Sequence, residues 1–167
     1  MSDKQRPQLT PRLLDRNSID KAYPLVRGIL PDVTLERWAE FAKPYFAARS
    51  PKWPRGLMTI QNGESYILGL FGFEVRDELR SSRTLFIYNI IVPQILGHDL
   101  IWAVVVSTAE TLAAINDCRT IQIKLSDDLN GQETGREWLG PSLTTSGYII
   151  EGIHAFKQMG PDALAHG

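Results

Sequence analysis

An apolar segment that leads into a long apolar helix constrains the fold of this chain most. Residues 85–92 read LFIYNIIV, and a corner that contains Gly97, His98 and Asp99 separates them from the pattern LIWAVVVSTAETLAAI at residues 100–115. The first segment is too continuously apolar for a strand with one wet face, so it predicts a central strand. The second is apolar around most of its circumference and must pack on a sheet. We therefore expect a buried strand that turns into a core helix.

The corner between this strand and this helix is a candidate binding site. The first turn of a helix has backbone N–H groups without helical partners and carries a partial positive charge, so a glycine there can admit a phosphate. Gly97 stands at this place, although it could instead serve only a turn conformation, and His98 could be an ordinary surface residue. Asp99 is an expected N-cap, yet its carboxylate would repel a diphosphate. The corner predicts a cofactor site with these alternatives open.

Size, charge and cysteine content exclude several classes of protein. At 167 residues with 43% hydrophobic residues, the chain suits one domain that buries roughly 70% of its unfolded surface. The formal net charge of -1 gives no bulk attraction to nucleic acid or acidic membranes. Cys118 is the only cysteine and His154 and His166 lack ligand-spaced companions, so we expect no disulfide, no metal and a cytoplasmic setting. Residues 100–106 are too short to cross a bilayer.

The remaining periodicity predicts a mixed α/β (α+β) fold. Residues 120–125 alternate apolar and polar side chains, so they should return parallel to the central strand in a right-handed crossover. Asn62-Gly63 is typical of a tight hairpin turn, and Gly69 and Gly72 indicate a bulge or a close approach. In chain order we expect a strand at 13–14, helices at 17–30 and 34–48, strands at 57–61, 65–75 and 84–92, a helix at 100–115, a strand at 120–125, a helix at 131–139 and a hairpin of 148–150 and 153–156.

This element order resembles the GNAT superfamily of N-acetyltransferases. The resemblance covers residues 12–158 and also rests on IIVPQILGHDLIWAVV at 90–105 and on WLGPSLTTSGYIIEGIHAFK at 138–157. It implies a GNAT-like mixed sheet with a central parallel strand pair and helices on both faces. Residues 1–11 would then form a flexible N-terminus and residues 159–167 a C-terminal tail.

The resemblance also implies acetyl-CoA as cosubstrate. In this family the strand matching 85–92 offers backbone groups to the pantetheine arm. The corner that follows this strand wraps the pyrophosphate. Its pattern in the family is Arg or Gln, any two residues, Gly, any one residue, and then Gly or Ala. Gln94 and Gly97 match this pattern and Asp99 departs from it, while counting from Pro93 would put Leu96 at the first position. The implied cofactor-binding residues are Ile91, Val92, Gln94, Leu96, Gly97, His98 and Asp99.

The family's chemistry is direct attack of an amine on the thioester, with a carboxylate or water as base and often a tyrosine as proton donor. That tyrosine usually precedes a glycine-aromatic pair, which is Gly147-Tyr148 here, but residues 142–146 contain no tyrosine. Ser142 or Thr144 could replace it weakly or serve only as turn and capping hydroxyls. Our candidates for catalysis are Glu74 and Tyr88, on predicted strands. Glu64 is expected to be exposed. Trp38, Tyr45 and Trp53 are expected to be core or lid packing, with stacking on a substrate as the alternative.

Three hypotheses follow from the sequence. The first is an acyl-CoA-dependent N-acyltransferase that acetylates a small-molecule or protein amine, with a homodimer as an open alternative to a monomer. The second is a catalytically impaired GNAT-fold module that senses a ligand or binds a partner. The third is a different α+β sensor domain, which a parallel pairing of residues 85–92 with 120–125 would exclude.

Overall fold

The described part of the chain forms a seven-stranded sheet in the order β1-β2-β3-β4-β5-β7-β6. The structure is a computed structural model and describes residues 8–47, 51–52, 54–94, 97–125, 136–151 and 154–160. Its elements are β1 (Thr10–Leu13), η1 (Arg16–Ser18), α1 (Ile19–Ile29), α2 (Leu35–Ala42), η2 (Lys43–Phe46), β2 (Arg55–Gln61), β3 (Ile67–Glu78), β4 (Ser82–Ile91), α3 (His98–Ile115), β5 (Thr120–Lys124), α4 (Arg136–Thr145), β6 (Ile149–Glu151) and β7 (His154–Gln158).

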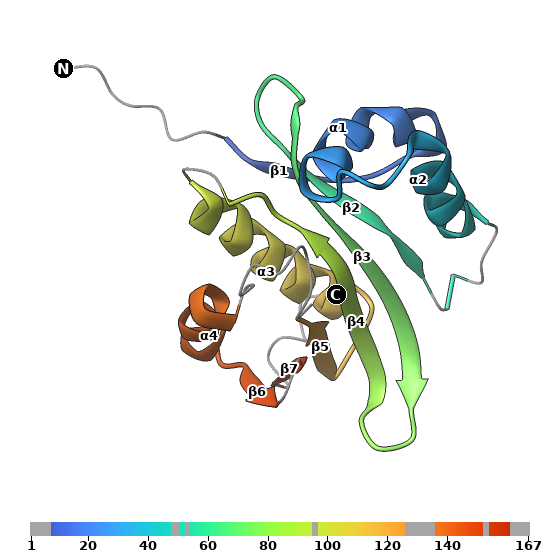
Figure 1. Ribbon diagram of the computed structural model, residues 1–167. Helices are drawn as coiled ribbons and strands as arrows, with labels where there is room; N and C mark the ends of the chain where they lie inside the picture. Colours follow the sequence, from blue (N-terminus) through green and yellow to red (C-terminus); the bar gives the residue numbers. More distant parts are fainter. Residues whose placement is uncertain are drawn as a thin grey trace.

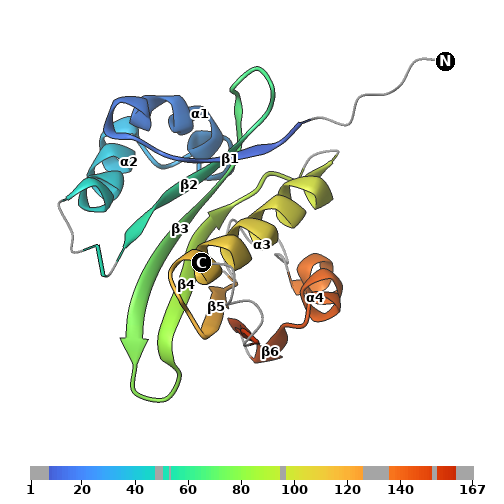
Figure 2. The same ribbon diagram turned by 180° about the vertical axis from the view of Figure 1, so that it is seen from behind.

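The sheet is mixed, and its parallel pair lies in the middle. β4 pairs with β5 in parallel, and the other neighbouring strands pair antiparallel. Helices α1 and α2 lie on one face, and α3 and α4 on the other (Figures 1 and 2). The predicted fold class, with a central parallel pair and helices on both faces, is confirmed. The parallel pairing excludes the antiparallel sensor folds.

Alternation along the strands gives each face its own core. On β3, Phe71 and Phe73 belong to the larger cluster under α3, while Leu70 belongs to the smaller cluster under α1 and α2. Trp38 is 2% exposed, and its Nε1 donates a hydrogen bond of 2.9 Å to the carbonyl of Ile19, which ties α2 to α1. Trp38 is thus a core residue.

α3 packs closely on the sheet at a glycine. An added Cβ at Gly69 would lie 2.8 Å from Cγ2 of Ile101, so the predicted close approach is confirmed. The buried residues of α3 are Ile101, Val105, Thr108, Ala109 and Ala113. By length and composition, α3 is the one described helix that could cross a membrane, contrary to our expectation of no such stretch. Its buried side packs on the sheet instead.

Several predicted elements differ from the structure in their bounds. The hairpin of β2 and β3 is confirmed, but its loop spans residues 62–66 because the Asn62 side chain accepts hydrogen bonds from the N–H groups of Glu64 and Tyr66, each 3.0 Å. The left-handed φ of 66° falls on Ser65 rather than Gly63. α2 gives way to η2 where Pro44, which has no N–H, interrupts the helical hydrogen bonds.

The helix predicted at 131–139 is also displaced. α4 spans Arg136–Thr145, and residues 131–135 lie outside the described part of the chain. The closing hairpin is confirmed as the antiparallel pair β6 and β7. β1 begins at Thr10, so the sheet includes residues upstream of 12.

Candidate functional site

The central strands part at a bulge in β4. Their ladder runs from Thr84↔Thr120 to Ile87↔Ile123, whereas β4 continues to Ile91. Between the register pairs Gly72↔Tyr88 and Leu70↔Ile91, β3 advances by two residues and β4 by three. Asn89 sits in this irregularity with a left-handed φ of 51°. A bulge bends its strand, so the end of β4 diverges from β5 and leaves backbone groups available between the two strands.

α3 begins close to this opening, at Gly97. Gly97 is the N-cap residue with a φ of 88°, and its carbonyl accepts hydrogen bonds from the N–H groups of Leu100 (3.0 Å) and Ile101 (3.4 Å). An added Cβ there would meet nothing within 4 Å. The backbone conformation, rather than lack of space, therefore requires glycine at this position.

The expected N-cap role of Asp99 is wrong. The helix starts at His98, so Asp99 is its second residue, and no side chain caps the helix. The Asp99 side chain is 89% exposed, and Oδ1 lies 2.9 Å from Nε2 of His98. With Gly97 as N-cap, the helix starts two residues earlier than the apolar pattern suggests, which displaces Asp99 from the capping position. The carboxylate is turned to solvent.

The other predicted cofactor residues divide into core and surface. Ile91 is 6% exposed and Val92 packs against the larger core, so their side chains are occupied by packing. Gln94 is exposed. Leu96 lies outside the described residues. For Ile91 and Val92, the backbone groups are thus the parts suited to contact a cofactor on the α3 side, while the Ile91 side chain belongs to the smaller core under α1 and α2.

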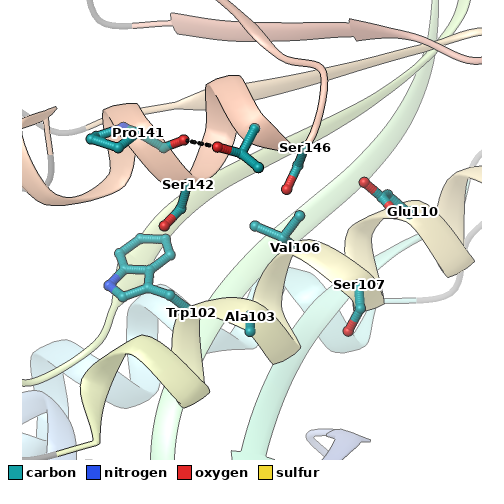
Figure 3. Close-up of a pocket in the computed structure, with 9 residues that line it drawn as sticks. Trp102, Ala103, Val106, Ser107, Glu110, Pro141, Ser142 and Ser146 are labelled. Carbon is teal, nitrogen blue, oxygen red and sulfur yellow. Dashed lines mark hydrogen bonds between the residues drawn. The ribbon is translucent and has the colours of Figure 1, made fainter.

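A cavity of about 510 Å³ lies between α3 and α4. In Figure 3, Trp102 and Val106 of α3 project toward α4, and Ser142 projects toward the Trp102 ring. The lining residues are Trp102, Ala103, Val106, Ser107, Glu110, Pro141, Ser142, Thr145 and Ser146. The cavity combines an apolar floor with several hydroxyl groups, a composition suited to a long, partly polar ligand.

The charge of Glu110 beside this cavity is balanced by Lys157 of β7. Nζ of Lys157 lies 2.8 Å from Oε1 of Glu110 and 2.7 Å from the carbonyl of Ser146, and it sits 5.3 Å from the ring centroid of Tyr148. These contacts join α3, the end of α4 and β7. Burial raises the pKa of Tyr148, and Glu110 adds to this effect, so the phenol stays protonated.

Three of the hydroxyl residues before Gly147, Ser142, Thr144 and Thr145, belong to α4, and Ser146 follows the helix in a turn. Thr145 Oγ1 donates a 2.8 Å hydrogen bond to the carbonyl of Pro141, and the carbonyl of Ser142 accepts one of 3.0 Å from the N–H of Ser146. The Thr145 hydroxyl thus has a local structural partner, whereas the Ser142 side chain faces the cavity (Figure 3).

The two predicted catalytic residues lie together on the opposite face of the sheet. The Tyr88 hydroxyl is 3.4 Å from Oε2 of Glu74, which also binds Nη2 of Arg76 at 2.6 Å. An added Cβ at Gly72 would lie 3.2 Å from the Tyr88 ring and 3.3 Å from the Tyr45 hydroxyl, so Gly72 makes room for both rings. Burial raises the pKa of Tyr88, and a hydrogen bond with Tyr45 and the charge of Glu74 add to it. Tyr88 is therefore a neutral phenol that can donate a proton.

A second cavity, of about 310 Å³, lies under α1 and α2 where β4 and β5 part. Its lining residues are Val26, Leu30, Val33, Arg37, Trp38, Phe41, Leu70, Asn89, Ile90, Ile91 and Lys124. Tyr88 and Lys124 share this face of the sheet, because each lies two residues beyond the register pair Phe86↔Gln122. Neither Glu74 nor Tyr88 lines the cavity itself.

The comparisons with known proteins agree on the fold. A spermidine N-acetyltransferase SpeG chimera from Vibrio cholerae and hSSAT superposes with a TM-score of 0.66 at 12% identity, over 90% of this chain and 95% of that one. A GNAT-family acetyltransferase from Streptococcus pneumoniae gives 0.65 at 14%, over 92% and 100%. The aminoglycoside N-acetyltransferase AAC(6')-Iy in complex with CoA gives 0.67 at 9%, over 89% and 93%. This chain has the GNAT fold. No model of a protein family matches its sequence, and neither does any curated protein.

Within the GNAT fold, the predicted residues fall into two groups on opposite sides of the parted strands. Ile91, Val92, Gly97, His98 and Asp99 follow one another from the end of β4 to the start of α3. Glu74 and Tyr88 meet on the face that carries α1 and α2. Trp53 and His166 lie outside the described residues.

Sequence reasoning named Ser142, Trp38 and Ile91 but missed most of the other residues that line the two cavities. Trp102 was assigned to the apolar helix without a role, and its position opposite α4 depends on where α4 lies. Arg37 and Lys124 are far apart in the chain, and only the packing of α2 near the end of β5 brings them to one cavity. A weak signal was available for Lys124, because it ends an alternating strand directly beside the central strand.

Proposed function

We propose that this protein is an acyl-CoA-dependent N-acyltransferase that transfers the acetyl group of acetyl-CoA to an amine by direct attack. The observation that carries the proposal is the parting of β4 and β5 at Asn89, beside the start of α3. Asn89 and the two residues after it line the cavity under α1 and α2, and the larger cavity lies between α3 and α4 on the other face. In this proposal the two substrates approach the parted strands from opposite faces and meet between them. The protein is proposed to be soluble and cytoplasmic.

The residues at the start of α3 fit a diphosphate. In this proposal the first-turn N–H groups of α3 bind the pyrophosphate of acetyl-CoA, with Gln94 and His98 beside it. The exposed carboxylate of Asp99 does not occupy this place, because it is turned to solvent and paired with His98. The backbone of Ile91 and Val92 would bind the pantetheine arm, and the cavity against Trp102 would receive the rest of the molecule.

The transfer needs one base and one acid. Glu74 would take a proton from the attacking ammonium group, directly or through water. The amine nitrogen then bonds to the thioester carbonyl carbon while the carbon–sulfur bond breaks, and the departing thiolate takes a proton from Tyr88. The acylated nitrogen loses its extra proton, directly or through water, to the Tyr88 phenolate, which restores the phenol. Arg76 holds the Glu74 carboxylate in position at 2.6 Å. The products are an N-acetyl amine and free coenzyme A.

Titration calorimetry of two glycine variants tests the donor site. We expect Gly97→Ala to weaken acetyl-CoA binding about tenfold, since a side chain at a φ of 88° strains the start of α3. Gly63→Ala is the matched control, because an added Cβ there meets nothing within 4 Å and the φ of Gly63 is not left-handed. This variant should bind acetyl-CoA with the affinity of the original protein. No heat from acetyl-CoA at millimolar concentration would refute the donor assignment.

A second candidate is a GNAT-fold module that binds the thioester without transferring the acyl group. The observation in its favour is the end of α4, where a tyrosine is absent from residues 142–146 and the Thr145 hydroxyl binds the Pro141 carbonyl. A panel of amines with acetyl-CoA, followed by thiol release, separates the two. Release of thiol with any amine supports the transferase, and binding without release supports the module.

A further inference from the structure

The cavity under α1 and α2 has the size and lining of a site for a small, largely apolar molecule. Its volume of about 310 Å³ is at the lower end for ligand sites, which span roughly 300 to 1,000 Å³. Most of its walls are aliphatic or aromatic side chains. Trp38 and Phe41 stack with ring centroids 5.8 Å apart, and Ile90 and Ile91 contribute from the bulged end of β4.

The charged groups of this cavity are both cations. Arg37 enters from α2 and Lys124 from the end of β5, and no carboxylate is among the described lining residues. The nearest counter-charge recorded for Arg37 is Glu40, at 3.8 Å, with 69% and 72% of the two side chains exposed. Such an exposed pair is weak, so a ligand anion can compete for the guanidinium. A cavity with two cations and apolar walls favours an anion on an apolar body and repels a polycation.

Asn89 lies where the ligand would meet the reaction path. It lines this cavity and belongs to the bulge at which β4 leaves β5. A ligand with its body against Trp38 and its anionic group near Arg37 and Lys124 could therefore direct a second polar group toward the opening between the strands. For an acceptor substrate, that group must be the amine.

We infer that the acceptor is a small amino carboxylate, a monoamine with an apolar body and one carboxylate bound by Arg37 and Lys124. This inference rests on the proposed transferase function and specifies its substrate class. It differs from the polycationic substrates that the names of two structural neighbours give, spermidine and aminoglycosides. Those substrates would meet two like charges in this cavity.

Pairs of amines that differ only in the carboxylate test the inference. The probes are L-phenylalanine against phenethylamine and L-leucine against isoamylamine, with spermidine as polycation. Calorimetry on protein saturated with coenzyme A measures binding, and thiol release from acetyl-CoA measures kcat/KM. We expect each amino acid to exceed its decarboxylated analogue at least tenfold in both measurements, and spermidine to be the poorest.

Charge-neutral variants identify the groups responsible. Arg37→Gln and Lys124→Gln should each reduce the preference for the carboxylate three- to tenfold, and the double variant should abolish it. Glu40→Gln should raise affinity for the amino acids, because it removes the competing carboxylate. Arg27→Gln and Lys43→Gln are the controls, since both residues are exposed and neither lines the cavity, and they should change nothing.

The outcomes separate the inference from the proposed function. Equal use of an amino acid and its decarboxylated analogue, or preference for spermidine, would overturn the substrate class while still supporting a transferase. If no amine releases thiol, the proposed transferase function fails. The binding measurements alone then test whether this cavity selects amino carboxylates. Amino acids that bind better than their analogues, with loss in the Arg37 and Lys124 variants, support the inference, and absence of such binding overturns it.

Discussion

Tyr88 is the residue whose surroundings bear most directly on the proposed chemistry. Its hydroxyl lies 3.4 Å from Glu74, its ring centroid is 6.4 Å from that of Tyr45, and it is half-buried. Burial raises its pKa further above the usual range. At neutral pH the phenol therefore has a proton to give and cannot act as a base. Of the two roles, only the acid role is therefore open to Tyr88, and the base role is left to Glu74.

Tyr88→Phe should lower kcat for acetyl transfer about 10- to 100-fold, the range typical for loss of a general acid. The ring and its packing remain, so the free energy of unfolding should change by less than about 1 kcal/mol, in line with one long hydrogen bond. Tyr66→Phe is the control, since that side chain is 64% exposed and distant from the Glu74 group in the fold. Steady-state kinetics and urea unfolding measure both quantities. An unchanged kcat would remove Tyr88 from the mechanism.

Residues that depend on strand alternation could be predicted from sequence, and residues that depend on packing could not. Glu74 and Tyr88 were selected as polar groups on apolar strands, and the structure brings them together. The N-cap role expected for Asp99 is wrong, because the start of α3 depends on the left-handed backbone of Gly97 rather than on a capping side chain. Arg37 and Lys124 were not selected at all, since no local pattern places α2 near the end of β5.

At the scale of elements, the contact between α3 and the sheet positions the start of the helix beside the end of β4. Gly69 of β3 permits this contact, because any larger residue would press against Ile101 in the second turn of α3. The sequence already indicated the close approach, although not the partner. Fold prediction succeeded where hydrophobic periodicity was strong, as in β4, α3 and β5. It failed at the hairpin loop, where the Asn62 side chain replaces the expected turn.

Gly69→Ala should destabilise the protein by about 1–3 kcal/mol, the usual cost of overpacking a core contact. The added Cβ would lie 2.8 Å from Cγ2 of Ile101, a β-branched side chain with little freedom to move. Gly28→Ala is the matched control, because that position is exposed on α1 with nothing within 4 Å of an added Cβ. It should stabilise the protein by about 0.4–1 kcal/mol. Urea unfolding compares the two.

The double variant Gly69→Ala with Ile101→Ala separates overpacking from other effects. Removal of the Ile101 side chain beyond Cβ creates space for the new methyl group, so the two substitutions should cost less together than the sum of their separate costs. Strictly additive costs would show that the loss in Gly69→Ala arises elsewhere than at the contact between β3 and α3.

At the scale of the whole molecule, the sheet lies between two cavities. The α3 and α4 face carries the larger cavity, and the α1 and α2 face carries the smaller, cation-lined one. The ladder of β4 and β5 ends at Ile87↔Ile123, next to the smaller cavity, which Asn89 and Lys124 line. The same packing buries groups that titrate in alkaline solution, so the fold as a whole acquires a defined response to high pH.

Stability should fall as pH rises from 9 to 11, because of Cys118. This thiol is 0% exposed, and burial raises its pKa from 9.0 to about 11, against a smaller opposing effect of Arg83. In this window the unfolded chain releases the proton while the folded chain retains it, so the unfolded state binds fewer protons and the free energy of unfolding decreases. The expected loss of stability is of the order of 2 kcal/mol. Burial also raises the pKa values of Tyr88 and Tyr148, so these two residues extend the loss above pH 10.

Urea unfolding at pH 8, 9.5 and 11 should show a shallower decline for Cys118→Ala than for the original protein. An identical decline in both would show that the thiol ionises equally in the folded and unfolded chain.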